Sequence, residues 1–203
     1  MKAWIAAALF CTGMLRADLT VVQKVEENGT KRPPEEMRLK IKGTKIRADI
    51  APEITLLMDT ATGDTATLYH HEKRYLLLTG SATRILEEKI RHFPPIGEPK
   101  LIAHEKLSGR PTDLYTVESG TVKITWWIVQ KGDDWEKYHP QLTPLRQSPM
   151  ARLSPNFDLP GLPIKTEFRT PDGRRIVTTV LDIHEAPLEE TDFAIPSGYR
   201  SLP

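Results

Sequence analysis

Apolar and polar side chains alternate with a period of two along much of this chain, the pattern of β-strands with one buried face. The clearest example covers residues 37–50. Leu39 and Ile41 alternate there with Lys40 and Lys42. We expect the two apolar side chains to point into a core and the two lysines to lie in solvent, in a sheet with one wet side.

Other segments show the same alternation, or short apolar runs between turn sequences. We expect further strands at residues 19–25, 54–58, 66–69, 74–79, 101–104, 112–118, 121–130, 162–170 and 174–184. Their connections are short, as at Asn28-Gly29 and at Pro171-Asp172-Gly173, and short connections require antiparallel pairing.

Two segments depart from this pattern. Residues 82–93 place apolar side chains at helical spacing, and Pro94-Pro95 ends the predicted helix. Residues 133–150 contain Trp135 and other apolar residues, but prolines interrupt them. We therefore expect only a short helical start at Asp133-Asp134, followed by irregular chain.

These elements predict a mainly β fold of the α+β class, in one domain at residues 18–203. An antiparallel sheet of nine or ten strands must curl or close, because a flat sheet of that size twists and exposes its edges. We expect a strongly curved sheet that is wrapped around a core or a cavity.

Residues 1–17 have the pattern of a cleavable signal peptide. Met1-Lys2 is a charged start, and Ala3 to Leu15 is an uncharged, mostly apolar run too short to span a bilayer. We expect cleavage after Ala17, or after Gly13 as the alternative, and a periplasmic or secreted mature protein. The competing interpretation is an N-terminal core helix of a cytosolic protein.

Cys11 is the only cysteine of the chain and lies inside this segment. The mature protein should therefore contain neither a disulfide nor a reactive thiol. A lipid anchor on Cys11 is disfavoured, because Phe10 stands where a lipoprotein signal needs a small residue.

Composition narrows the classes of partner. Hydrophobic residues make up 39% and charged residues 27% of the chain, which is typical of a water-soluble globular protein. A formal net charge of +1 gives no long-range field to attract nucleic acid or an anionic membrane. We expect no nucleic-acid partner and no transmembrane segment in the mature form, and the oligomeric state stays open.

The sequence offers no recognisable catalytic or metal-binding motif. Its six histidines are scattered, and the adjacent pair His70-His71 would point to opposite faces of a strand. Residues 59–64 fit a hairpin turn better than a calcium loop. No Gly-x-Ser-x-Gly elbow or phosphate loop occurs. We therefore predict no enzyme activity, no catalytic residue, no metal and no cofactor.

The strand at 121–130 has one wholly apolar face that includes Ile124, Trp126 and Ile128. Trp127 lies on the opposite face, which also carries Lys123. Ordinary core packing explains such a face, and a ligand site requires that the concave face be incompletely filled.

The end of the chain carries the most recognisable motifs: Leu159-Pro160-Gly161-Leu162-Pro163, Lys165-Thr166-Glu167-Phe168, Val177-Thr178-Thr179-Val180 and Asp192-Phe193-Ala194-Ile195-Pro196-Ser197-Gly198-Tyr199. With Met58-Asp59, and Tyr75 on a following strand, they resemble a group of exported bacterial proteins of unknown function in the LolA and LppX-like superfamily of lipoprotein-sorting-like proteins. The resemblance implies an unclosed β-barrel with one or two helices over its concave mouth, and periplasmic binding of acyl chains or lipidated partners. No binding residue is carried over, because the shared ending is structural.

Two functions follow as hypotheses. The first is a periplasmic binding or carrier protein for a hydrophobic ligand, which is a lipid, an acyl chain or a lipidated protein. The second is a non-catalytic structural or sensory module of the cell envelope, with a packed core and a protein partner. Six residues are candidates for lining a hydrophobic cavity: Leu39, Ile41, Tyr75, Ile124, Trp126 and Ile128.

Overall fold

Twelve strands form one sheet in the computed structural model of the chain. The structure describes residues 18–29, 33–90, 97–119, 122–129, 133–147 and 159–202. The predicted signal peptide at 1–17 and the predicted helix stop at Pro94-Pro95 lie outside the described residues.

The strands agree closely with the alternating segments of the sequence. They are β1 Leu19–Asn28, β2 Glu35–Lys42, β3 Lys45–Ala51, β4 Ile54–Asp59, β5 Asp64–Tyr69, β6 Arg74–Leu78, β7 Lys100–Leu107, β8 Arg110–Ser119, β9 Val122–Val129, β10 Leu162–Arg169, β11 Arg175–Glu185 and β12 Arg200–Ser201. The helices among the described residues are α1 Gly80–Ile90, α2 Asp133–Gln147 and the short 3-10 helix η3 Glu190–Phe193.

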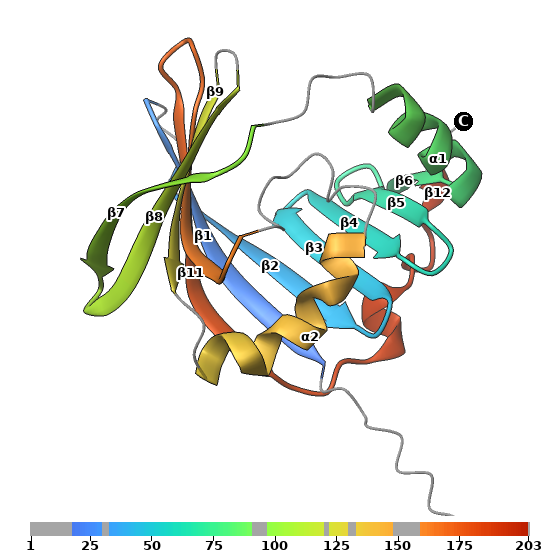
Figure 1. Cartoon of the computed structure of the whole chain (residues 1–203). Helices are drawn as coiled ribbons and strands as arrows, with labels where there is room; N and C mark the ends of the chain where they lie inside the picture. The colour runs from blue at the N-terminus through green and yellow to red at the C-terminus, as the bar shows by residue number, and fades with distance from the viewer. Residues whose placement is uncertain are drawn as a thin grey trace, which may run out of the picture.

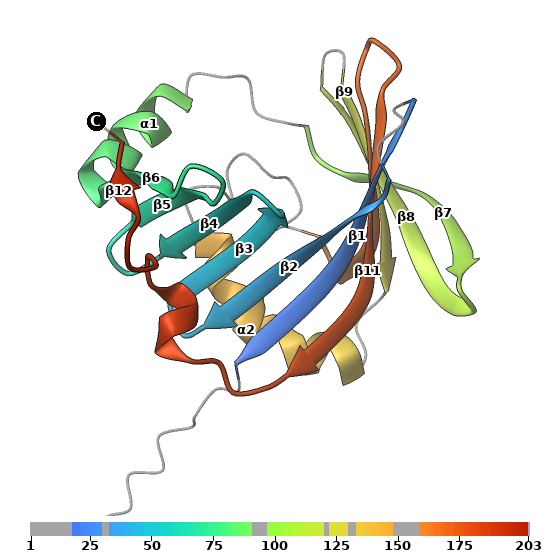
Figure 2. The same cartoon turned by 180° about the vertical axis from the view of Figure 1, so that it is seen from behind.

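The strand order is β12-β6-β5-β4-β3-β2-β1-β11-β10-β9-β8-β7. Neighbours are antiparallel, except that the two-residue β12 runs parallel to β6. Figures 1 and 2 show that the sheet is strongly curved and does not close, with α2 lying across its concave face. The predicted curved antiparallel sheet and unclosed barrel are therefore confirmed.

β1 occupies a central position, although it is the first strand of the sheet in the sequence. It pairs with β2 on one side and with β11 on the other. Its first residue, Leu19, is fully buried and is opposite Glu185 near the end of β11. The first strand in the sequence and the eleventh are thus neighbours in the middle of the sheet.

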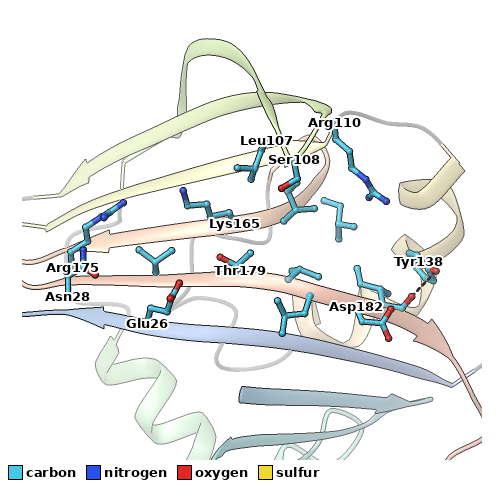
Figure 3. Close-up of a pocket in the computed structure, with 16 residues that line it drawn as sticks. Glu26, Asn28, Leu107, Ser108, Arg110, Tyr138, Lys165, Arg175, Thr179 and Asp182 are labelled. Atoms are coloured by element: carbon cyan, nitrogen blue, oxygen red, sulfur yellow. Dashed lines mark hydrogen bonds between the residues drawn. The ribbon is translucent and has the colours of Figure 1, made fainter. Parts of the chain in front are cut away.

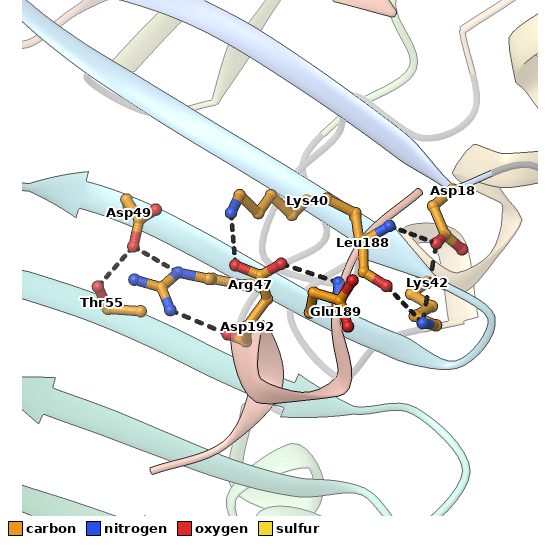
Figure 4. Close-up of polar contacts among 9 residues, drawn as sticks. All are labelled: Asp18, Lys40, Lys42, Arg47, Asp49, Thr55, Leu188, Glu189 and Asp192. Carbon is orange, nitrogen blue, oxygen red and sulfur yellow. Dashed lines mark hydrogen bonds and ion pairs between the residues drawn. The ribbon is translucent and has the colours of Figure 1, made fainter. Parts of the chain in front are cut away.

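The convex face is not fully exposed to solvent, which corrects the expectation of a sheet with one solvent-exposed side. The C-terminal strap, defined here as residues 186–202, crosses the convex face of the first strands (Figure 4). Lys40 Nζ lies 2.6 Å from Asp192 Oδ1, and Lys42 Nζ donates to the carbonyl oxygen of Leu188 across 2.5 Å. The strap thus covers both lysines in part and leaves 24% and 29% of their side-chain surface exposed, so the prediction that they lie in solvent holds only in part.

Helix α2 corrects a second expectation. It continues through Pro140 and Pro144, where irregular chain was predicted. A proline removes one helical hydrogen bond, but the cost is local. Burial of Tyr138 and the packing of Leu142 and Leu145 against the concave face offset it. Tertiary contacts thus override the local propensity.

Helix α1 confirms the helical period of its segment, but it begins two residues earlier than predicted. The carboxylate of Asp64 accepts a hydrogen bond from the Gly80 amide across 2.8 Å. A side chain at Gly80 would place its Cβ 2.0 Å from the carbonyl oxygen of Thr62, so only glycine fits at this helix start. Within the described chain, neither helix has the length and apolar character needed to cross a bilayer.

Candidate functional site

Three of the six candidate residues lie together in a tightly packed cluster. Ile124, Trp126 and Ile128 point from β9 into the concave face, with exposed fractions of 7%, 0% and 0%. Val117 and Leu159 complete this cluster. The three side chains are therefore core residues.

Leu39 and Ile41 belong to a second cluster on the same concave face. Ile41 is buried, Leu39 is partly buried, and both pack with Leu19 and Val21 beneath Tyr138 of α2. The inward orientation expected for Leu39 and Ile41 is confirmed, but helix α2 fills the space in front of them.

Tyr75 lies on the opposite face of the sheet. Asp49 is on the convex face. Directly opposite residues of neighbouring strands share a face, and the pairs Asp49–Thr55, Thr55–Leu68 and Leu68–Tyr75 therefore place Tyr75 on the convex face too. The ring of Tyr75 packs in a third cluster, with Leu68 and with Tyr199 of the C-terminal strap. The structure thus does not bring Tyr75 together with the other five candidates.

A cavity of about 570 Å³ lies elsewhere, along β10 and β11 and beside the end of β1 (Figure 3). Helix α2 and the tip of the β7–β8 hairpin also contribute to its walls. None of the six candidates lines it. The lining residues are Glu26, Asn28, Leu107, Ser108, Arg110, Tyr138, Leu162, Ile164, Lys165, Arg175, Val177, Thr179, Val180, Leu181, Asp182 and Ile183. We call this cavity the β10–β11 cleft.

At one end of the cleft, two neighbouring strands diverge. The ladder between β10 and β11 runs from Arg169 opposite Arg175 to Lys165 opposite Thr179, and it ends there. β11 continues to Glu185, but beyond Thr179 its only partner strand among the described residues is β1. Residues 162–164 of β10 and 180–183 of β11 therefore face each other across the cavity instead of across a ladder.

Local features of both strands explain the divergence. Ile164 is an extra residue of β10 in its pairing with β9, and Leu181 is an extra residue of β11 in its pairing with β1. Such bulges bend a strand and interrupt its ladder. Pro163 has no amide hydrogen, so β10 offers no donor at that position. Two bulges and one proline thus end the ladder at the same level.

The side chains of the cleft are mixed. Leu162, Ile164 and Leu181 contribute apolar surface, and Leu181 is 55% exposed. The Lys165 ammonium lies 4.0 Å from the centre of the Trp127 ring, a cation–π geometry. One carboxylate oxygen of Asp182 lies 2.6 Å from Nδ1 of the His184 ring.

A buried ion pair supports the basic wall of the cleft. Glu167 is buried beneath the cleft, where its carboxylate binds the guanidinium groups of Arg175 and Arg169. Burial by itself raises the pKa of Glu167, but the hydrogen bonds from Arg175 and Arg169 outweigh it and hold the pKa below its usual value. Nε of Arg175 is buried without a hydrogen-bond partner in the described structure.

Helix α2 closes one end of the cleft. The Tyr138 hydroxyl donates to the carbonyl oxygen of Ile183 across 3.2 Å, and the Gln141 amide donates to the Glu185 carboxylate across 2.8 Å. The carbonyl group of Ile183 thus has a side-chain partner on the side where the ladder to β10 is missing.

The sequence did not point to this cleft. Gly161 and Pro163 at the start of a strand are a signal of irregular pairing that could have been used. A Cβ at Gly161 would lie 2.2 Å from the carbonyl oxygen of Val129, so close approach to β9 requires glycine there. Nothing in the alternation of β11 marks Leu181 as a bulge, because both of its neighbours along the chain, Val180 and Asp182, fit either face.

The remaining polar groups form no obvious reaction centre. In the described ranges, no three His, Cys, Asp or Glu side chains gather where they could hold a metal ion. His104 Nδ1 lies 2.6 Å from Asp113 Oδ1 across the β7–β8 pair, but neither residue lines the cleft. The cleft offers recognition groups rather than a paired acid and nucleophile.

Comparisons with known proteins concern the fold. No family model matches the sequence, and no curated protein is similar to it. Matching solved structures include PNGF-II (10% identity, TM-score 0.46, 92% of this chain and 31% of that one). They also include LolA superfamily protein NE2245 from Nitrosomonas europaea (9% identity, TM-score 0.35, 88% and 90%) and the lipoprotein LppX from Mycobacterium tuberculosis (9%, 0.41, 84% and 88%).

The chain thus spans about a third of the PNGF-II chain and most of the two others. A LolA superfamily protein and LppX, which belong to the group that the sequence motifs resemble, are thus among the matching structures.

Proposed function

We propose that this chain is an exported, non-catalytic binding protein that holds a hydrophobic ligand in the β10–β11 cleft. The observation that carries the proposal is the cavity of about 570 Å³ along β10 and β11, which extends into the place where the two strands diverge. Ligand sites commonly have volumes of roughly 300–1,000 Å³.

The exposure of apolar side chains to this cavity supports a hydrophobic ligand. Leu181 is 55% exposed, and it lines the cavity together with Leu162 and Ile164. Covering apolar surface contributes about 25 cal/mol per Å² removed from water. A ligand with an apolar part would gain this contribution without any rearrangement of the core.

The packing of the concave face argues for the cleft as the ligand site. Trp126 and Ile128 are fully buried, and α2 covers Ile41. A ligand on that face would have to displace packed side chains, which costs several kcal/mol for a large buried residue. The cleft requires no such displacement.

Charged groups at the cleft offer contacts to the polar end of a ligand. Arg110, Lys165 and Arg175 line it beside the carboxylates of Glu26 and Asp182, and Arg175 also pairs with Glu167. Arginine and lysine bind carboxylate or phosphate oxygens through charge-assisted hydrogen bonds. The signal-like residues 1–17 support a periplasmic location, with secretion as the alternative.

A fluorescent probe tests the proposal. 8-Anilinonaphthalene-1-sulfonate, which is apolar and anionic, should bind the folded protein at one site and be displaced by oleate. Leu181→Asp should weaken this binding at least tenfold. Leu101→Asp is the matched control, because Leu101 is a comparably exposed leucine (46%) on β7, and it should leave the affinity unchanged. Equal affinities of the two variants, or no probe binding to the folded wild type, would overturn the proposal.

A further inference from the structure

We infer that the convex face carries a second recognition site, a small pocket beside the C-terminal strap that takes one aromatic side chain of a protein partner, with a basic residue next to it. The pocket has a volume of about 170 Å³ and lies between β4, β5, β6 and the strap residues Phe193 and Ile195. We call it the strap pocket. It shares no lining residue with the β10–β11 cleft, so the inference goes beyond the proposed function.

A small residue between two larger ones forms the floor of the strap pocket. Leu57, Ala66 and Leu77 are directly opposite one another on β4, β5 and β6, and Leu57 is opposite Arg47 on the convex face. Leu57 and Ala66 are buried, whereas Leu77 is 46% exposed. The methyl group of Ala66 does not fill the space that a larger side chain would take in this row, and the strap leaves part of Leu77 uncovered.

The walls of the strap pocket are apolar on two sides. Phe193 and Ile195 line it from the strap, and Ile195 packs against the cluster that contains Leu57 and Ala66. Contact with all of these groups would remove apolar surface from water, which stabilises a complex by about 25 cal/mol per Å². The occupant therefore has an apolar group at its tip.

The size of the strap pocket limits that group. An apolar cavity of about 150 Å³ is large enough to bind benzene, and sites for whole small-molecule ligands usually have volumes of roughly 300–1,000 Å³. The strap pocket thus suits one aromatic ring better than a complete lipid. A single aromatic side chain seated in a pocket is a common anchor of protein–protein interfaces.

Two carboxylates at the rim indicate the residue next to the anchor. Asp59 and Asp64 are directly opposite each other on β4 and β5, where like charges repel. Each accepts a hydrogen bond from a backbone amide, and neither forms an ion pair within the part of the chain that the structure describes. Lys45 is near Asp59, but its ammonium pairs with Glu190 of the strap across 2.5 Å. An arginine or lysine of the partner would relieve the repulsion between the two carboxylates.

The test follows backbone amide shifts of the ¹⁵N-labelled protein by NMR during titration with the acetylated, amidated tetrapeptide Gly-Phe-Arg-Gly. The shifts should change at residues 57–66 and 193–195 and stay constant at residues 162–183. The tetrapeptides Gly-Ala-Arg-Gly and Gly-Phe-Glu-Gly, which lack the ring or reverse the charge, should each bind at least threefold more weakly.

Variants of the protein locate the binding. Ala66→Leu fills the floor of the strap pocket and should abolish binding of the first peptide. Ala103→Leu makes the same change on β7, away from the pocket, and should leave the affinity unchanged. Far-UV circular dichroism checks that both variants are folded. The double change Asp59→Asn and Asp64→Asn keeps the pocket and should remove the preference for arginine over glutamate, so it tests the charge recognition even if Ala66→Leu does not fold.

Other results would overturn the inference. These are the absence of shift changes at the strap pocket, equal affinity for the arginine and glutamate peptides, and full binding by folded Ala66→Leu. Shift changes at the same residues with oleate but not with peptide would assign the pocket to a lipid. Shift changes on dilution of the protein alone would assign it to a second copy of this chain. None of these results affects the cleft, which anilinonaphthalene sulfonate and Leu181→Asp test separately.

Discussion

The Tyr138 hydroxyl donates a hydrogen bond across 3.2 Å to the carbonyl oxygen of Ile183 and so joins helix α2 to the edge of β11. The ring of Tyr138 packs at the same time on Leu19, Val21 and Ile41. One side chain therefore contributes both to the core of the concave face and to the wall of the cleft.

Tyr138→Phe separates these two contributions. The ring stays in the core, but the carbonyl oxygen of Ile183 loses its partner, so the free energy of unfolding should fall by about 1 kcal/mol. Tyr138→Ala also leaves a cavity and should cost about 3–5 kcal/mol. Urea denaturation measures both values. Equal losses in the two variants would mean that the ring contributes nothing to the core.

Pro140→Ala should stabilise the protein by roughly 1–3 kcal/mol, because proline is about 3 kcal/mol less favourable than alanine inside a helix. Pro140 is exposed within α2, so its replacement leaves no cavity. Pro144 is buried and serves as the contrast, since Pro144→Ala also removes packing. The midpoint of thermal unfolding measures the change. A lower midpoint for Pro140→Ala would show that the proline is required in this helix.

Helix α2 marks the limit of what local sequence reveals. The strands could be predicted, because the period-two alternation of apolar and polar residues is a local property of the sequence. The prolines of α2 argue against a helix, and the packing of Tyr138, Leu142 and Leu145 on a distant part of the sheet stabilises it. That contact depends on strands more than a hundred positions away in sequence, so no local window contains it.

The two faces of β2 can be compared by substitution. Leu39→Asp should cost several kcal/mol, because it places a charge in the cluster beneath α2. Lys40→Asp should now cost about 1–3 kcal/mol, since it breaks the ion pair with Asp192 and opposes two carboxylates. Lys106→Asp on exposed β7 is the control and should change stability by less than about 0.5 kcal/mol. Chemical denaturation of the three variants gives the comparison, and a negligible cost of Lys40→Asp would show that the strap contact is weak.

The strap should also lose stability in acid. The hydrogen bond from Lys40 lowers the pKa of Asp192, while burial acts in the opposite direction. Because the folded-state pKa is lower than the unfolded value of about 4, this contact stabilises the fold above that pH and is lost as pH falls toward the folded pKa. The free energy of unfolding should therefore fall less between pH 5 and pH 2 in Lys40→Met than in the wild type. Parallel curves would contradict this prediction.

Export is tested at the N-terminus. A reporter fused to residues 1–25 should cross the inner membrane, and mass spectrometry of the mature protein should find Asp18 as its first residue. Asp18 is the first described residue, and its carboxylate accepts a hydrogen bond from the Leu188 amide across 2.8 Å. Recovery of protein that retains Met1 from native cells would contradict both the signal and the location.

The cleft illustrates a second limit. Burial of Ile124, Trp126 and Ile128 follows from their shared face, but alternation cannot tell whether a face is filled by the protein or by a ligand. The answer depends on α2 and on Leu159, which come from other parts of the chain. The divergence at Lys165 and Thr179 depends on how the bulges of two strands align, and a single strand pattern does not contain this information.

The central place of β1 has a consequence for biosynthesis. Asp18 and Leu188 are 170 positions apart in sequence, yet they are in contact, and the ladder of β1 with β11 lies beside them. A ribosome must therefore produce nearly the whole domain before β1 gains its second neighbour. Folding that depends on such distant pairing is slow, because loop-closure entropy is lost before any contact compensates for it. The sheet around β1 therefore cannot be completed until β11 has been synthesised.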